Sequence, residues 1–224
     1  MKMPEVSSVV KVGAGRGFVF EQKVRTPGWG NPELTKFNLV PFIRYRRVIT
    51  AAHCLPHFPL PHSGEGHDQY YPDLLGVIGG EKPSVWAQLI FADPIADIAV
   101  LGCPDDQAMP EEAAAYEALV EPVKAIRIDK AQTGKGWMLS LDTPCTWVPT
   151  HLTLNDYGTL CCGFTLGGQS GSPLLNEEGK AVGLVAMGGE TGSKDGSKMV
   201  PNEVNGPQPI LKRHLSAELL WKAR

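Results

Sequence analysis

The sequence predicts an all-β fold of two β units, joined by a short helical connector and followed by a C-terminal helix. Three observations support this prediction. Short runs of β-branched or alternating apolar residues, each of strand length, recur along the 224-residue chain between turn residues. The 25 glycines and 19 prolines are scattered, as many tight turns require. Only two segments, one near the middle and one at the end, show helical features instead.

The first unit occupies the first hundred residues and ends at about residue 103. A long loop rich in proline and histidine, residues 55–73, interrupts it and shows no apolar period. Strands are predicted on either side of this loop, because the runs there are too short for helices. They cover residues 7–12, 17–24, 37–43, 46–50, 74–79, 84–92 and 97–101.

The connector, residues 104–124, contains the segment MPEEAAAYEALVEP at 109–122. A proline near the first helical position, two acids in the first turn and a closing proline predict a short helix.

The second unit, residues 125–206, returns to strand-like runs at 125–128, 136–141, 145–154, 159–166 and 181–187. Residues 207–224 form the last segment. Within it, Leu211, Leu215 and Leu219 share one face, which predicts an amphipathic C-terminal helix.

Charge and hydropathy argue against two classes of partner. The formal net charge is −3, and the only basic cluster, RYRR at 44–47, is too short for a nucleic-acid-binding face. No window of 18 apolar residues exists, and Lys11 and Arg16 interrupt any signal-peptide core near the N-terminus. We therefore expect neither nucleic acid nor a membrane as a partner.

The five cysteines are odd in number and irregularly spaced, unlike the even set of a disulfide-bonded secreted domain. Reduced thiols and a cytoplasmic location are the better interpretation. A zinc site is the competing idea, because His57, His62 and His67 lie in one loop. Their spacing matches no familiar ligand pattern and the chain has no C-x2-C, so we expect no metal and no cofactor.

Three segments contain residue types that could carry chemistry. VITAAHC (48–54) places His53 directly after an apolar strand, where a hydrogen-bonded core histidine is the alternative to a catalytic one. PIADIAVL (94–101) places Asp97 at the head of another strand, where its carboxylate needs a partner. That partner is either a backbone N–H or the His53 ring. GGQSGSPLL (167–175) surrounds Ser170 with small residues.

The order His, Asp, Ser distinguishes between folds, because the same three roles appear in a different order on each unrelated scaffold. The α/β-hydrolase elbow G-x-S-x-G is not met, since position 172 is serine. That fold also requires strands that alternate with helices, and the chain lacks this pattern.

The three segments together resemble the signature segments of the chymotrypsin-like (trypsin-type) serine peptidases. GWM at 136–138 and GLVAMGG at 183–189 fall where that family has its Gly-Trp strand and its substrate-pairing strand. The resemblance implies two antiparallel β-barrels of the six-stranded type, packed face to face with a catalytic cleft between them, and a C-terminal helix. It makes Ser170 the nucleophile, His53 the general base and Asp97 the residue that fixes the His53 tautomer. The backbone N–H groups of Gly168 and Ser170 would form the oxyanion hole.

The chain departs from secreted members of this family. Gln169 stands where many of them carry an aspartate that pairs with a newly cut N-terminus, and no cysteine precedes Cys54 to bridge it. Activation by N-terminal cleavage is therefore not expected. These departures resemble the intracellular, bacterial-type and HtrA-like branches.

The specificity pocket follows from the same resemblance. Phe164 and Thr165 would form its floor, and the far wall would be Val185, Ala186, Met187, Gly188 and Gly189. Because the floor has no acid, we expect an uncharged, apolar substrate side chain. Lys194 or Lys198 could instead favour an acidic one.

The predicted function is a serine endopeptidase that acts on a protein or peptide substrate. One alternative is a catalytically silent module of the same fold that pairs a peptide strand against residues 185–188. Another makes Cys161 or Cys162 the nucleophile, although core packing accounts better for both. A regulatory protein partner or a fused domain remains open.

Overall fold

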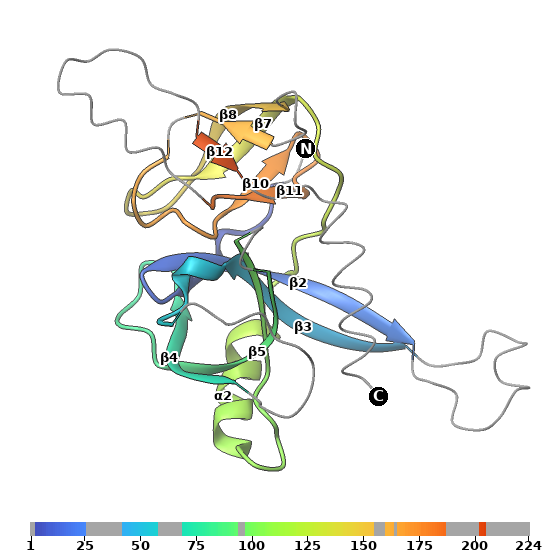
Figure 1. The fold of residues 1–224 in the computed structure, drawn as a ribbon, viewed down its shortest axis with the longest axis vertical. Helices are drawn as coiled ribbons and strands as arrows, with labels where there is room; N and C mark the ends of the chain where they lie inside the picture. Colours follow the sequence, from blue (N-terminus) through green and yellow to red (C-terminus); the bar gives the residue numbers. More distant parts are fainter. Residues whose placement is uncertain are drawn as a thin grey trace, which may run out of the picture.

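The computed structural model describes residues 3–25, 42–57, 69–93, 97–154, 160–163, 165–186 and 202–204. Its elements fall into two halves stacked along the longest axis of the molecule (Figure 1). The predicted architecture of two β units, mostly β with one short helix, is confirmed.

The first half is a closed antiparallel barrel with the strand order β1-β2-β3-β6-β5-β4. Its strands are β1 (Val9–Val12), β2 (Gly15–Arg25), β3 (Phe42–Ala51), β4 (Tyr70–Val77), β5 (Val85–Asp93) and β6 (Ile98–Gly102). The first and fourth strands pair to close the barrel, with Val10 opposite Val77. Closure leaves no free sheet edge in this half.

Two boundaries in this half differ from the sequence prediction. The run predicted at 46–50 belongs to a longer strand, β3, which starts at Phe42, because Arg44 and Tyr45 continue the ladder with β2. Residues 37–41 of the other predicted run lie outside the described residues. Arg44 and Arg46 lie 3.9 and 4.0 Å from the carboxylate of Glu21 on that neighbouring strand. The strand β4 begins at Tyr70, inside the segment that was expected to be loop.

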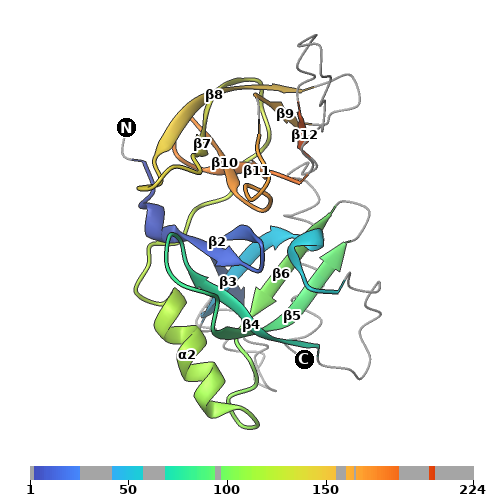
Figure 2. The same ribbon diagram turned by 90° about the vertical axis from the view of Figure 1, so that its left-hand side faces the viewer.

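The connector helix α2 (Pro110–Val120) begins as predicted, with Pro110 in its first turn and two glutamates after it. It packs against β5 and β3 on the side of the barrel away from the second half (Figure 2). Tyr116 is buried and donates its hydroxyl proton toward the carbonyl oxygens of Arg46 (3.1 Å) and Leu101 (3.3 Å). These contacts fix the helix to the middle of β3 and to the end of β6.

The second half is a six-stranded sheet with the order β11-β10-β7-β8-β9-β12. Its strands are β7 (Gly134–Leu139), β8 (Trp147–Leu154), β9 (Leu160–Cys162), β10 (Pro173–Asn176), β11 (Ala181–Leu184) and β12 (Asn202–Val204). The predicted strand at 125–128 forms only an isolated bridge between Ile128 and Ala181. The helix predicted from residue 209 lies outside the described residues, and closure of this sheet into a barrel stays a prediction.

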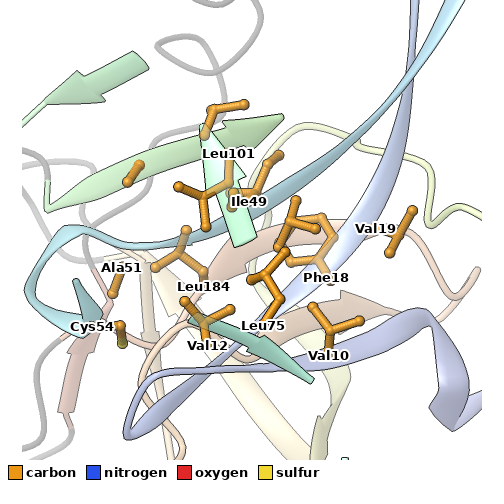
Figure 3. Packing of buried hydrophobic residues seen from close by; sticks show 14 of the residues in the cluster. Val10, Val12, Phe18, Val19, Ile49, Ala51, Cys54, Leu75, Leu101 and Leu184 are labelled. Carbon is orange, nitrogen blue, oxygen red and sulfur yellow. The ribbon is translucent and has the colours of Figure 1, made fainter. Parts of the chain in front are cut away.

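The main hydrophobic core spans both halves. Leu139, Leu175 and Leu184 of the second sheet belong to the same buried cluster as Phe18 and Leu75 of the barrel. Figure 3 shows Leu184 among Val12, Ala51 and Leu75. A second, smaller cluster lies within the second sheet and consists of Met138, Leu152, Leu160, Cys162, Leu174, Val182 and Val185.

The N-terminal segment also joins the halves. The indole Nε1 of Trp147 donates to the carbonyl oxygen of Pro4 at 2.8 Å, and the hydroxyl of Ser8 donates to that of Lys124 at 2.6 Å. Neither the α-helix nor the 3-10 turns in the described part of the chain are long and apolar enough to cross a bilayer.

Candidate active site

His53 and Asp97 are brought together by the ends of two paired strands. Ala51, the last residue of β3, lies opposite Ile98, the first residue of β6. His53 follows in the 3-10 turn Ala52–Cys54, and Asp97 directly precedes β6. The backbone N–H of Ala52 donates to the carbonyl oxygen of Asp97 at 3.1 Å, which fixes the two ends relative to each other.

Both carboxylate oxygens of Asp97 bond to His53. Oδ2 lies 2.6 Å from the ring Nδ1, and Oδ1 accepts the backbone N–H of His53 at 2.9 Å. The carboxylate is 13% exposed, whereas the ring is 41% exposed. Since an ionised carboxylate can only accept, the neutral ring must carry its proton on Nδ1, and Nε2 is left with a free lone pair. Of the two partners considered for the Asp97 carboxylate, a backbone N–H alone or the His53 ring, the structure therefore shows the ring, together with the backbone N–H of the same residue.

Asp97 adopts this position with a φ of +54°, in the left-handed region. Aspartate enters that region more readily than most residues, but the conformation still has to be held by its surroundings. The bonds from Ala52 and His53 hold it. The carboxylate is therefore aimed at the ring by local backbone geometry as well as by side-chain packing.

The segment around Ser170 is a tight turn held by its own backbone. Gln169 N–H donates to Leu166 at 3.1 Å, and Ser172 N–H donates to Gln169 at 2.9 Å. Gly168 and Gly171 have φ values of +90° and +79°, which other residues adopt at a cost. Within the described part of the chain, no acceptor lies within hydrogen-bonding distance of the N–H groups of Gly168 or Ser170. Those two donors are free to bind a carbonyl oxygen.

Close backbone contacts place this turn against the residues beside His53. The N–H of Arg16 donates to the carbonyl oxygen of Ser170 at 2.7 Å. A Cβ at Gly15 would lie 2.8 Å from that same oxygen and would overlap the sulfur of Cys54. Gly15 thus separates the residue after His53 from Ser170 with no room for a side chain.

Gly171 makes the corresponding approach from the other side. A Cβ there would overlap the carbonyl oxygen of Arg16 and lie 2.7 Å from the Thr50 hydroxyl, on the strand that leads to His53. No hydrogen bond joins the Ser170 hydroxyl to the His53 ring among the described residues. Such bonds are often long in unliganded sites and tighten when substrate binds.

The predicted pocket is described only in part. Thr165, Val185 and Ala186 are buried. Both backbone groups of Val185 bond to the turn that carries Ser170, through the N–H of Gly171 (2.6 Å) and the carbonyl oxygen of Ser172 (2.9 Å). Any pairing with substrate therefore falls to later residues. Phe164, Met187, Gly188 and Gly189 lie outside the described residues.

Cys54 and Cys162 are not suited to nucleophilic attack. Cys54, Cys103, Cys145 and Cys162 are free thiols. Burial raises the pKa of Cys54, beside His53, to about 11, and Cys162 is only 2% exposed. The thiolate is the reactive form, so these environments leave the sulfurs inert. The Cys161 side chain, and the two histidines at 62 and 67, lie outside the described residues.

Sequence reasoning missed three residues that build the site: Gly15, Arg16 and Thr50. The Thr50 hydroxyl donates to the carbonyl oxygen of Arg16 at 2.6 Å. The one available signal was a charged residue between glycines in an otherwise apolar stretch, GRGFVF at 15–20.

Comparisons with known proteins bear on the family and the fold of the chain. The sequence profile of the trypsin-like peptidase domain matches residues 42–184. No curated protein matches the sequence significantly.

Among solved structures, the chain is similar to an inactive serine-to-alanine mutant of Rv3671c from M. tuberculosis. The TM-score is 0.50 and the identity 18%, over 94% of this chain and 86% of that one. It is also similar to the HtrA-type protease AlgW with a decapeptide, with a TM-score of 0.49 and 14% identity, over 96% of this chain and 65% of that one. The likeness to Rv3671c supports the fold, and the profile match covers most of the chain, from the start of β3, before His53, to the end of β11, after Ser170. The chain belongs to the trypsin-like peptidase family.

Proposed function

We propose that the protein is a serine endopeptidase that works through an acyl-enzyme on Ser170. In this mechanism the Ser170 Oγ attacks the carbonyl carbon of the scissile bond as His53 Nε2 takes its proton. The carbonyl oxygen becomes an oxyanion, bound by the N–H groups of Gly168 and Ser170.

Collapse of this intermediate breaks the C–N bond, and His53 passes its proton to the leaving amine. A water molecule then attacks the ester, again with His53 as base, and releases the acid product and the free serine. Asp97 keeps the ring proton on Nδ1 and stabilises the imidazolium that forms in each half-reaction.

One observation carries this proposal: Asp97 bonds both the ring and the backbone N–H of His53, while Nε2 has no hydrogen-bond partner among the described residues and the ring is 41% exposed. A core histidine of purely structural function would bury its ring and satisfy both nitrogens. The free Gly168 and Ser170 donors, described above, supply the oxyanion site. The family match makes peptide bonds the favoured substrate.

Replacement of Ser170 with alanine tests the proposal. We expect turnover of a peptide pool to fall by about six orders of magnitude. A serine-directed phosphonate should label the parent protein and not Ser170→Ala. Ser172→Ala is the matched control, because its hydroxyl is buried two residues away and has no hydrogen-bond partner in the described part of the chain. Equal labelling of the parent and Ser170→Ala contradicts the proposal. Binding of peptides by the parent without cleavage would favour the silent module.

Substrate preference and location follow as parts of the same proposal. We infer an uncharged, apolar residue on the acyl side of the cleaved bond, at a pocket that includes Thr165. The free state of the described cysteines supports a reducing compartment, the cytoplasm. Profiling of the cleaved pool by mass spectrometry tests the preference, and a dominant basic or acidic residue at the cleavage site would contradict it.

A further inference from the structure

The side chain of Arg16 crosses from the barrel to the second half. Its Nη1 donates to the carbonyl oxygens of Ser140 (2.8 Å) and Leu139 (3.4 Å). Leu139 is the last residue of β7, and Ser140 follows it. Its Nη2 lies 3.8 Å from the sulfur of Cys145. The residue is 6% exposed, and within the described part of the chain its side chain contacts no carboxylate.

A buried guanidinium without an acidic partner is costly, because the loss of hydration is repaid only by hydrogen bonds. Burial lowers the pKa of Arg16, and Cys145 opposes this shift. The ordinary value is so high that the group stays charged at neutral pH. This position therefore carries a cost in stability that an apolar residue of similar volume would avoid.

The Leu139 carbonyl oxygen is shared with Gln169, the residue before Ser170. Gln169 Nε2 donates to it at 2.9 Å, and Gln169 Oε1 accepts the backbone N–H of Leu166 at 2.7 Å. The Gln169 side chain is only 3% exposed. A continuous set of bonds thus runs from the Arg16 guanidinium through Leu139 and Gln169 to Leu166, at the start of the Ser170 turn.

The backbone of Arg16 holds the other end of the same turn. Its N–H donates to the Ser170 carbonyl oxygen, and its own carbonyl oxygen contacts Gly171 and accepts the Thr50 hydroxyl. Arg16 therefore contacts one end of the turn directly and is linked to the other end through Leu139 and Gln169. Between those ends lies Gly168, which is held by no hydrogen bond of its own among the described residues.

We propose that Arg16 is a positioning residue that works with Gln169 to hold residues 166–171 so that the Gly168 and Ser170 N–H groups converge. This inference rests on the proposed peptidase function. Donors that are fixed before the reaction stabilise an oxyanion far better than donors that must reorganise. The buried side chains of Arg16 and Gln169 hold these donors in place before substrate binds. Gln169, which cannot form an ion pair with a cut N-terminus, acts instead as the amide link between Leu139 and Leu166.

The test compares Arg16→Met and Arg16→Lys with the parent. Arg47→Met is the matched control, since Arg47 is a partly buried arginine of the barrel that stacks on Tyr45, 4.8 Å from its ring centroid. We expect Arg16→Met to lower kcat by about 10- to 100-fold, with KM changed by less than about threefold. Arg16→Lys, which keeps the charge but loses the planar fork, should recover part of this loss.

Two further readouts separate positioning from loss of stability. A peptide boronate, which forms a tetrahedral adduct on Ser170, should lose affinity in parallel with kcat, while a product peptide should not. Amide hydrogen exchange over residues 165–172 should be faster in Arg16→Met than in Arg47→Met, and this measurement needs no activity.

The outcomes distinguish the two proposals. Unchanged exchange in the turn, or a loss of kcat that Arg47→Met matches, overturns the role of Arg16. An increase in KM alone overturns it as well. If Arg16→Met does not fold, the same comparisons are made on Arg16→Lys. A parent protein that neither cleaves peptides nor reacts with the phosphonate refutes the proposed peptidase function and, with it, the effect of Arg16 on catalysis. The hydrogen-exchange result still decides whether Arg16 and Gln169 order residues 166–171.

Discussion

Replacement of Asp97 with asparagine isolates the pairing on which the proposed mechanism depends. Asparagine has nearly the same shape and also tolerates the φ of +54° at this position, so the backbone should be preserved. The backbone N–H of His53, which donates to Oδ1 at 2.9 Å, requires an oxygen there. The asparagine amide must therefore turn its NH2 group toward the ring Nδ1.

This orientation has a definite consequence for His53. Facing a donor, Nδ1 must accept, so the ring proton moves to Nε2 and the ring can no longer take a proton from Ser170. We expect kcat/KM to fall by about ten-thousandfold, which corresponds to about 5.5 kcal/mol in the transition state.

The assay is hydrolysis of a fluorogenic peptide chosen from the cleavage profile. Nitrogen-15 NMR of labelled histidine should show the change of tautomer directly. Asp129→Asn is the control, because it removes an equal charge from a surface pair with Lys180. A loss of less than tenfold in Asp97→Asn, with the NMR showing the proton moved to Nε2, would refute the assigned role of Asp97.

Three further predictions concern stability and reactivity. Gly171→Ala should prevent folding or abolish labelling of the nucleophile because its Cβ would overlap the Arg16 carbonyl oxygen. In Gly168→Ala the Cβ would make only ordinary van der Waals contacts, so the positive φ alone should cost about 1–2 kcal/mol in urea unfolding. Similar losses in both would contradict this. Tyr116→Phe should lower unfolding stability by about 1 kcal/mol without a change in kcat, since only a buried hydrogen bond is lost; an unchanged midpoint would be the contrary result. Cys54, with a pKa of about 11, has a thiolate fraction of about one in a thousand at pH 8, so iodoacetamide should not modify it in the folded protein. The thiol of Cys54 ionises at a lower pH in the unfolded chain than in the folded protein, so its contribution to stability should be lost as pH rises from about 9 to 11. A rise in the free energy of unfolding over that range would refute the raised pKa of Cys54.

The positions of His53 and Asp97 could be predicted because each adjoins an apolar strand. The position of a polar side chain at such a boundary is restricted by the buried strand beside it. The pairing of β3 with β6 then brings these two strand ends together. The first barrel was likewise predictable, since alternating runs separated by turn residues specify strands locally. Short-range patterns were sufficient for both.

Arg16 could not be predicted because its partners are distant in the sequence. Leu139 and Ser140 lie 123 and 124 residues away, and their contribution is a backbone carbonyl, which any residue type provides. The strand β10 was missed for a related reason. It has four residues, begins at a proline and is buried throughout, so it shows no alternation.

The shared hydrophobic core has a consequence for synthesis of the protein. Phe18 and Leu75 share one buried cluster with Leu184, which leaves the ribosome more than a hundred residues later than Leu75. The N-terminal barrel is therefore synthesised first and exposes an apolar face until the second half follows. During that interval it can bind chaperones or aggregate. Truncation after residue 124 should give a barrel that aggregates readily. Its stability should be lower than expected for a barrel with a closed hydrogen-bond ladder.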